Sequence, residues 1–87
     1  MSQGLLITKV APEYPEEARQ AHIQGTVILQ VRIDKGGNVV SLELISGHPM
    51  LAATAIAAVR QWKYRPYLLN GEPVEVDTQV LVNFVLQ

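Results

Sequence analysis

The stretch from Thr26 to Ser46, TVILQVRIDKGGNVVSLELIS, decides the fold of this 87-residue chain. Apolar and polar residues alternate along Thr26–Asp34, with Ile28 as the exception, which is the pattern of a half-buried β-strand. Lys35–Asn38 holds two adjacent glycines, which we expect to supply positive φ angles at a turn. Val39–Ser46 alternates again. The stretch therefore predicts an antiparallel hairpin that turns at Lys35–Asn38.

A helix is predicted on each side of this hairpin. Before it, two prolines hold Pro12–Pro15 extended, and Pro15 suits the first residue of a short helix that runs to about His22. After it, apolar residues recur at helical spacing over Pro49–Trp62, with many alanines that permit close approach to a sheet. Both helices can bury their apolar faces against the same face of the sheet.

The last strand is the longest, over Val74–Leu86. Its apolar residues share one face, interrupted only by Thr78, and the other face is mostly polar. A right-handed connection lets it pass over the second strand and lie beside the first, at the edge of the sheet. We predict an α+β fold in the order α-β-β-α-β, with a small antiparallel sheet of three strands and two helices packed on one face. A fourth strand is expected if Leu5–Thr8 pairs.

The composition excludes several classes of protein. Hydrophobic residues make up 48% of the chain, which is enough for one folded core and rules out disorder. The net charge of −1 gives no bulk attraction to nucleic acid or to an anionic membrane. Without cysteine there are no disulfides, thiolate metal sites or cysteine nucleophiles. We interpret residues 1–9 as an expression scar or the end of a linker, and residues 10–87 as one domain.

No group of residues points to catalysis, to a metal or to a cofactor. His22 and His48 lack the ligand spacing of a metal site. We expect His22 to cap a helix end or pack partly in the core, and His48 to lie in a solvated turn. Ser46–His48 is not part of a nucleophile elbow, and Asp77–Gln79 lacks the glycine that follows the Asp-Thr pair of aspartic proteases. We therefore predict that the chain is not an enzyme.

Arg60–Tyr67 interleaves three basic with three aromatic residues, a pattern that can bind single-stranded nucleic acid. Trp62, however, continues the apolar stripe of the second helix, so we expect it to be buried and to serve packing. The chain also lacks a broad basic face. No nucleic-acid partner is predicted, and a small nucleic-acid binder is kept as the weaker alternative.

Several segments in fixed order carry a resemblance to a known family. They are Pro12–Ala18, Gly25–Val27, Asp34–Val39, Ser46–Gly47, Ala53–Val59, Arg60–Pro66 and Val80–Phe84. Together they resemble the C-terminal domain of the TonB family of energy transducers, over roughly Val10–Leu86. The structural motif of the resemblance comprises Tyr14, Pro15, Gly25, Gly36, Gly37, Trp62, Tyr64 and Pro66. The turn at Leu68–Pro73 is longer than in the best-known TonB.

The resemblance implies a periplasmic domain of a protein anchored by one helix in the inner membrane of a Gram-negative bacterium. Such a protein works with the ExbB–ExbD motor and grasps the TonB box peptide of an outer-membrane receptor. It thereby couples the proton motive force to the uptake of iron complexes or vitamin B12. The resemblance places the receptor contact on the last strand, at Val76, Asp77, Thr78, Gln79, Val80, Leu81, Val82 and Asn83.

Physical reasoning agrees with a contact of this kind. An edge strand presents unpaired N–H and C=O groups that another chain can complete without any particular side chain. The same edge can instead pair two copies of the chain in a homodimer, or be covered by Leu5–Thr8. A self-associating structural module is therefore the second alternative to a receptor-binding domain.

Overall fold

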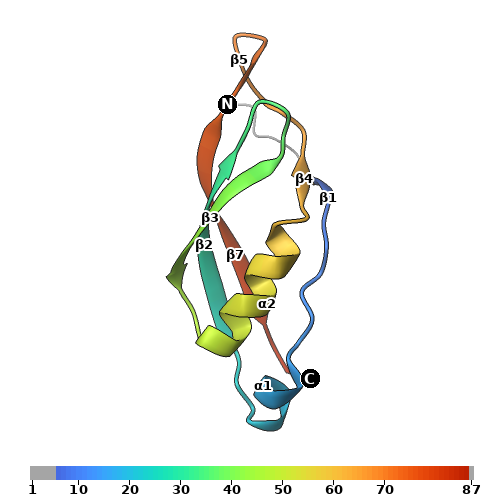
Figure 1. The fold of residues 1–87 in the computed structure, drawn as a ribbon, viewed down its shortest axis with the longest axis vertical. Helices are drawn as coiled ribbons and strands as arrows, with labels where there is room; N and C mark the ends of the chain where they lie inside the picture. The colour runs from blue at the N-terminus through green and yellow to red at the C-terminus, as the bar shows by residue number, and fades with distance from the viewer. Residues whose placement is uncertain (1–5, 87) are drawn as a thin grey trace.

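A three-stranded antiparallel sheet with a helix across one face organises the computed structural model, which describes residues 6–86 (Figure 1). β2 (Gly25–Ile33) lies in the middle, between β3 (Val39–Ser46) and β7 (Val76–Phe84). The helix on the sheet is α2 (Pro49–Val59). The α+β fold and the placement of the last strand beside the first, at the edge of the sheet, are confirmed.

The connection from β3 through α2 to β7 has the opposite hand to the one we expected. In the lower half of Figure 1, α2 lies in front of the sheet, with β3 to the left of β2 and β7 to the right. Because β3 and β7 run downward and α2 runs upward, the connection is left-handed, the rarer hand. Residues 60–75 separate α2 from β7, so the helix does not feed the strand through a short turn.

The core lies between this sheet and α2, and the alternation along the strands decides which side chains enter it. All four alternate apolar residues of β2 from Val27 to Ile33 are buried, and β7 contributes Val80, Val82 and Phe84. From α2 come Leu51, Ala52, Ala55, Ala58 and Val59. Three of these five are alanines, which let the helix backbone approach the sheet closely.

α1 (Glu16–Gln20) is short and lies at the end of the sheet, with Ala18 as its buried residue. Pro15 is not its first helical residue as expected, because it has an extended conformation and forms the N-cap. The Tyr14 ring meets the Phe84 ring edge-on at 5.6 Å between centroids, and the Tyr14 hydroxyl donates to the Ile23 carbonyl. The Tyr-Pro element therefore fastens the N-terminal segment to the end of β7.

The N-terminal strand does not extend the three-stranded sheet. β1 (Leu6–Thr8) pairs with β4 (Lys63–Tyr64) in a separate two-stranded ribbon, and Leu5 lies outside the described residues. Next to this ribbon, Trp62 is 7% exposed and its Nε1–H donates to the Val10 carbonyl at 2.9 Å. The predicted burial of Trp62 is confirmed, although α2 ends at Val59 and Trp62 follows in the next turn.

The turn between β2 and β3 is built around Asp34 and Gly37. Asp34 Oδ1 accepts the backbone N–H groups of Gly36 and Asn38 at 2.9 and 2.8 Å, and the Gly37 N–H donates to the Asp34 carbonyl. Of the two glycines, only Gly37 has a positive φ, +85°, so our expectation for Gly36 was wrong. Gly37 also accepts a hydrogen bond from the Tyr64 N–H, which joins the turn to β4.

The chain before β7 forms a hairpin rather than a longer turn. β5 (Tyr67–Leu69) pairs with β6 (Glu72–Val74), and Asn70 and Gly71 at its tip both have positive φ. The predicted strand over Val74–Leu86 is therefore divided at Glu75. The Asn-Gly pair is the signal for a tight hairpin, and it could have predicted these two strands.

The hydrogen bonds to Asp34, first that from the Asn38 N–H, hold the pKa of its carboxyl below the ordinary value. A pKa that is lower in the folded than in the unfolded state stabilises the fold above the unfolded value of about 3.9. This stabilisation is lost as the pH falls through the folded pKa. We expect Asp34→Asn to lower the urea midpoint of unfolding at pH 7, and the gap to the parent to shrink by pH 3. A gap that stays constant with pH would contradict this prediction.

Candidate functional site

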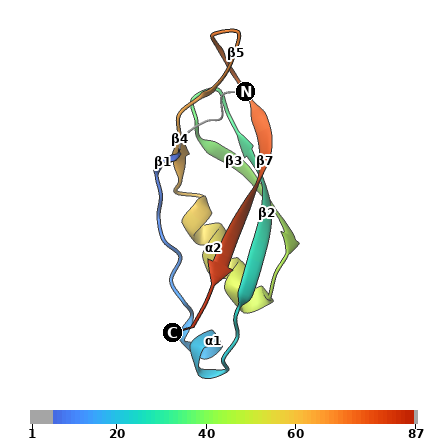
Figure 2. The same ribbon diagram turned by 180° about the vertical axis from the view of Figure 1, so that it is seen from behind.

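The outer edge of β7 is the main candidate for a site. β7 pairs with β2 over nine consecutive residue pairs, from Val76 opposite Ile33 to Phe84 opposite Gly25, without a break in register. No other strand within residues 6–86 pairs with β7 (Figure 2). The long row of backbone groups on its far side is therefore open to another strand.

Stereochemistry decides which backbone groups face outward. The N–H and C=O of one residue point to the same side of a strand, and successive residues alternate. In the lower half of Figure 1, β2 lies to the left of β7, which runs downward, and α2 lies in front of both. For L-residues in this arrangement, the β7 residues whose side chains face α2 direct their backbone N–H and C=O groups toward β2. The residues with outward backbone groups are then the four with solvent-facing side chains, namely Asp77, Gln79, Leu81 and Asn83.

The opposite edge of the sheet, β3, differs from β7. Its pairing with β2 shifts register twice, between Ile28 and Leu29 and between Arg32 and Ile33. The β3 residues left out of the pairing are Val40 and Ile45. Bulges twist an edge and interrupt its row of hydrogen-bonding groups, which is a common protection against strand addition. Of the two edges, only β7 offers an unbroken row.

Two of the four solvent-facing side chains of β7 are hydrogen-bonded to side chains of β2. Asp77 Oδ1 accepts Arg32 Nε–H at 2.8 Å, and Thr26 Oγ1 donates to Asn83 Oδ1 at 2.6 Å. Leu81 is 60% exposed and lies opposite Ile28. The hydrogen bond to Arg32 lowers the pKa of the Asp77 carboxyl. The side chains of Asp77 and Asn83 thus have partners on β2, whereas the outward backbone N–H and C=O groups of β7 have no partner strand within residues 6–86.

All eight sequence-predicted contact residues lie on β7, but in two groups. The side chains of Val80 and Val82 are buried in the core, and those of Val76 and Thr78 are half-buried. The side chains of Asp77, Gln79, Leu81 and Asn83 are exposed. The second group therefore offers a partner the more accessible side chains.

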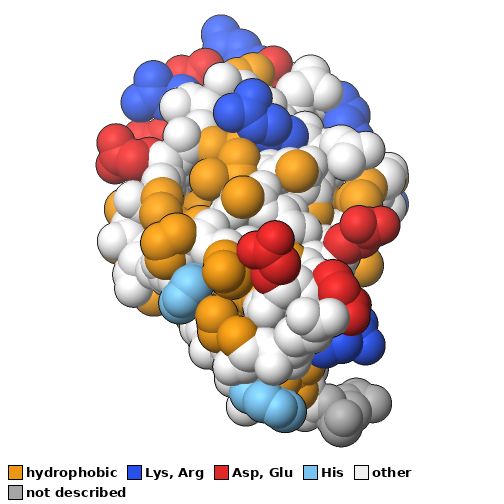
Figure 3. All heavy atoms as spheres, turned by 60° about the horizontal axis from the view of Figure 1, so that its bottom comes forward, with side chains coloured by type: hydrophobic (Ala, Val, Ile, Leu, Met, Phe, Trp, Pro, Cys, Tyr) orange, Lys and Arg blue, Asp and Glu red, His pale blue; other side chains and the backbone are white. Residues whose placement is uncertain are grey.

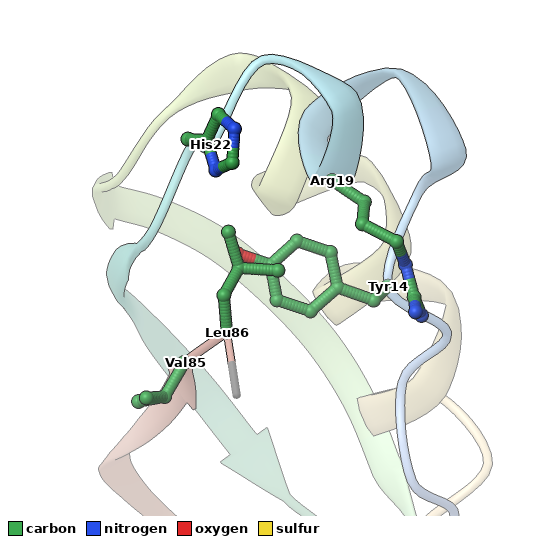
Figure 4. A pocket seen from close by; sticks show the side chains of 5 residues that line it. All are labelled: Tyr14, Arg19, His22, Val85 and Leu86. Carbon is green, nitrogen blue, oxygen red and sulfur yellow. The ribbon is translucent and has the colours of Figure 1, made fainter.

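A pocket of about 390 Å³, which the sequence did not indicate, lies at the C-terminal end of β7 (Figure 4). Tyr14, Arg19, His22, Val85 and Leu86 line it. His22 is exposed, so the expectation that it packs partly in the core was wrong. The position of His22 just after the short helix, where glycine is usual, is the signal that could have drawn attention to it.

The other motifs serve the fold. Trp62 and Tyr64 are buried at 7% and 8% exposure and Tyr67 is half-buried, so two of the three aromatic rings of Arg60–Tyr67 are not accessible for stacking on bases. His48 lies in an exposed turn as expected, and its Nδ1 also accepts the Met50 N–H at the start of α2. Within residues 6–86, no three His, Asp or Glu side chains come together in the manner of metal ligands. Neither described helix is long and apolar enough to cross a membrane.

Two known proteins are similar to this chain over most of its length. A protein named Protein TonB from Vibrio cholerae is 35% identical over 86 residues, which cover 97% of this chain and 35% of that protein. Protein TonB from Xanthomonas campestris is 42% identical over 77 residues, covering 86% of this chain and 34% of that protein. The chain thus spans about a third of the length of these relatives.

A solved structure has the same fold. The solution NMR structure of the Pseudomonas aeruginosa TonB C-terminal domain superposes with a TM-score of 0.82 at 20% identity, over all of this chain and 90% of that one. The sequence also matches the family described as Gram-negative bacterial TonB protein C-terminal over residues 10–86, nearly its whole length. The chain therefore belongs to the family of TonB C-terminal domains.

Proposed function

We propose that this domain captures an extended peptide, the TonB box of an outer-membrane receptor, as an added strand on the outer edge of β7. The observation that carries the proposal is the unbroken nine-pair register of β7 with β2 together with the open outer edge. A partner strand can then bond to the outward N–H and C=O groups of Asp77, Gln79, Leu81 and Asn83. Such binding depends little on sequence, which suits one domain that serves several receptors.

The whole protein is proposed to be an energy transducer anchored in the inner membrane, with this domain in the periplasm. Membership of the TonB family supports this proposal. In it, the ExbB–ExbD motor supplies the energy, and the captured peptide transmits it to a receptor for iron complexes or vitamin B12. The contribution of this domain is binding, and no catalytic step is assigned to it.

Strand addition at the β7 edge also suits a domain that transmits a pulling force to its partner. A strand pulled along its own length loads all its hydrogen bonds together, in shear. Each backbone hydrogen bond contributes only about 0.5–1.5 kcal/mol net. We therefore expect modest affinity at rest, spread over several bonds rather than concentrated in one side chain.

The test is a titration of the ¹⁵N-labelled domain with a synthetic TonB-box peptide from a receptor of the same organism. The largest amide shifts are expected over Val76–Asn83. Gln79→Pro removes one outward N–H donor and is expected to abolish binding, whereas Gln79→Ala keeps the donor and is expected to change affinity less than threefold. Circular dichroism shows whether the proline variant is folded.

A second control changes the peptide instead of the domain. The same peptide with N-methyl groups on alternate residues keeps its side chains but loses donors, so one of the two N-methyl patterns should fail to bind. Shifts centred on Trp62–Tyr67, equal binding by both N-methyl patterns, or no shifts at any accessible concentration would reject the proposal.

A further inference from the structure

The pocket at the end of β7 is placed where an added peptide would leave the strand. Two of its lining residues, Val85 and Leu86, directly continue β7. The Leu86 N–H donates to Gln24 Oε1 at 2.8 Å, which keeps this continuation beside the start of β2. A peptide that runs along the outer edge and passes Phe84 comes to Val85 and Leu86, two of the residues that line the pocket, in whichever direction it runs.

The pocket pairs a cation with apolar walls. Figure 4 shows the Tyr14 ring at its centre, with Arg19 on one side and Val85, Leu86 and His22 on the other. The Arg19 guanidinium lies 5.8 Å from the centre of the Tyr14 ring. No carboxylate lines the pocket among the described residues, although acidic and basic side chains mix on this end of the molecule (Figure 3).

Arg19 has hydrogen-bonding capacity to spare. Its nearest carboxylate contact is Glu16, with Nε and Oε2 3.9 Å apart, which is beyond the length of a hydrogen bond. The planar guanidinium offers a fork of N–H donors that matches a carboxylate in a bidentate arrangement. An acidic group entering the pocket can therefore bind Arg19 without displacing a strong existing partner.

His22 occupies a backbone position at which glycine is the usual residue. It follows α1 with a φ of +56°, its N–H donates to the Arg19 carbonyl, and the next N–H, of Ile23, donates to the Ala18 carbonyl. This is the Schellman ending of a helix, in which the left-handed residue is usually glycine. Residues held in unfavourable conformations cluster at functional sites, and here the unfavourable residue brings an imidazole to the pocket.

We propose that this pocket receives an Asp or Glu side chain of the peptide that adds to β7. The carboxylate binds the guanidinium of Arg19, with the imidazole of His22 as a second donor, and the Tyr14 ring and Leu86 pack against the methylene groups. The proposal rests on the proposed function of β7 and deepens it. It gives the backbone-driven edge a preference for peptides with an acidic residue at one end.

The test uses TonB-box peptides in which a single Glu is moved through the residues that flank the box, each compared with the same peptide carrying Gln. At one position we expect the Glu peptide to bind about threefold to fivefold more tightly, the upper part of the range of an exposed ion pair. Arg19→Gln should remove this preference. Arg60→Gln, which changes an exposed arginine at the end of α2, should keep it.

A second variant separates this role from stability. His22→Gly is expected to raise the thermal midpoint, because glycine adopts a positive φ freely, and to reduce the preference for Glu over Gln. Equal affinity of the Glu and Gln peptides at every position, with amide shifts still seen over Val76–Asn83, would overturn the acidic pocket and leave strand addition standing. A preference that persists in Arg19→Gln would also overturn it. Absence of the β7 shifts with every peptide would instead reject the proposed function.

Discussion

Replacing Trp62 with alanine is expected to remove about 3–5 kcal/mol from the free energy of unfolding, as truncation of a buried large aromatic does. The side chain is 7% exposed and belongs to the main core, where its ring lies 6.5 Å from that of Tyr64. A domain of this size has a total stability of only about 4–13 kcal/mol. Urea unfolding followed by circular dichroism measures the difference, and the loss is expected to be a large fraction of that total.

Trp62→Phe is the matched control, because it keeps most of the bulk and loses the Nε1–H bond to the Val10 carbonyl. It should cost about 1–3 kcal/mol, the range for leaving a partner unsatisfied. If Trp62→Ala melts like the parent, the indole has no packing role. If Trp62→Phe is as damaging as Trp62→Ala, the hydrogen bond to the N-terminal segment is the dominant contribution.

The second large effect is expected at Gly37. A Cβ there would lie 1.9 Å from the Tyr64 carbonyl oxygen, a backbone atom that cannot move without disturbing β4. The conformation with φ of +85° costs a non-glycine residue about 1–2 kcal/mol. Loss of the hydrogen bond between the Tyr64 N–H and the Gly37 carbonyl adds about 0.5–1.5 kcal/mol. Gly37→Ala should therefore lower stability by about 1.5–3.5 kcal/mol.

Gly71 offers a close comparison for this prediction. Its φ is +82°, but nothing lies within 4 Å of the position of an added Cβ. Gly71→Ala should accordingly show only the cost of the left-handed conformation, about 1–2 kcal/mol. Equal destabilisation by the two substitutions in urea unfolding would mean that the close approach to β4 has no energetic consequence.

The parts of the fold that follow from short-range patterns could be predicted from the sequence. The alternation of β2 and β3 and the apolar spacing of α2 gave their positions to within a few residues. The hand of the connection could not be predicted, because it depends on the path of residues 60–75. The pairing of β1 with β4 was also missed, since a three-residue and a two-residue strand carry too little pattern to indicate a partner.

The candidate site, too, could be predicted from the sequence only in part. The predicted connection through the second helix indicated an edge position for the last strand, and the structure places β7 there, although the connection has the opposite hand. The pocket at its end combines Tyr14, Arg19 and His22 with Val85 and Leu86, which are more than 60 residues further along the chain. The packing of Tyr14 on Phe84, the pairing of Gly25 with Phe84 and the hydrogen bond from Leu86 to Gln24 bring these two parts together, and no local pattern predicts such contacts.

The two bulges of β3 also limit how many strands the sheet can accept. With the β3 edge interrupted and the β7 edge regular, a second copy of the chain can add to the sheet only through β7. Two copies that pair through β7 occupy both regular edges and form a closed pair, which cannot lengthen into a fibre. Peptide and second copy then compete for the same edge, so the apparent affinity for peptide should fall as the protein concentration rises.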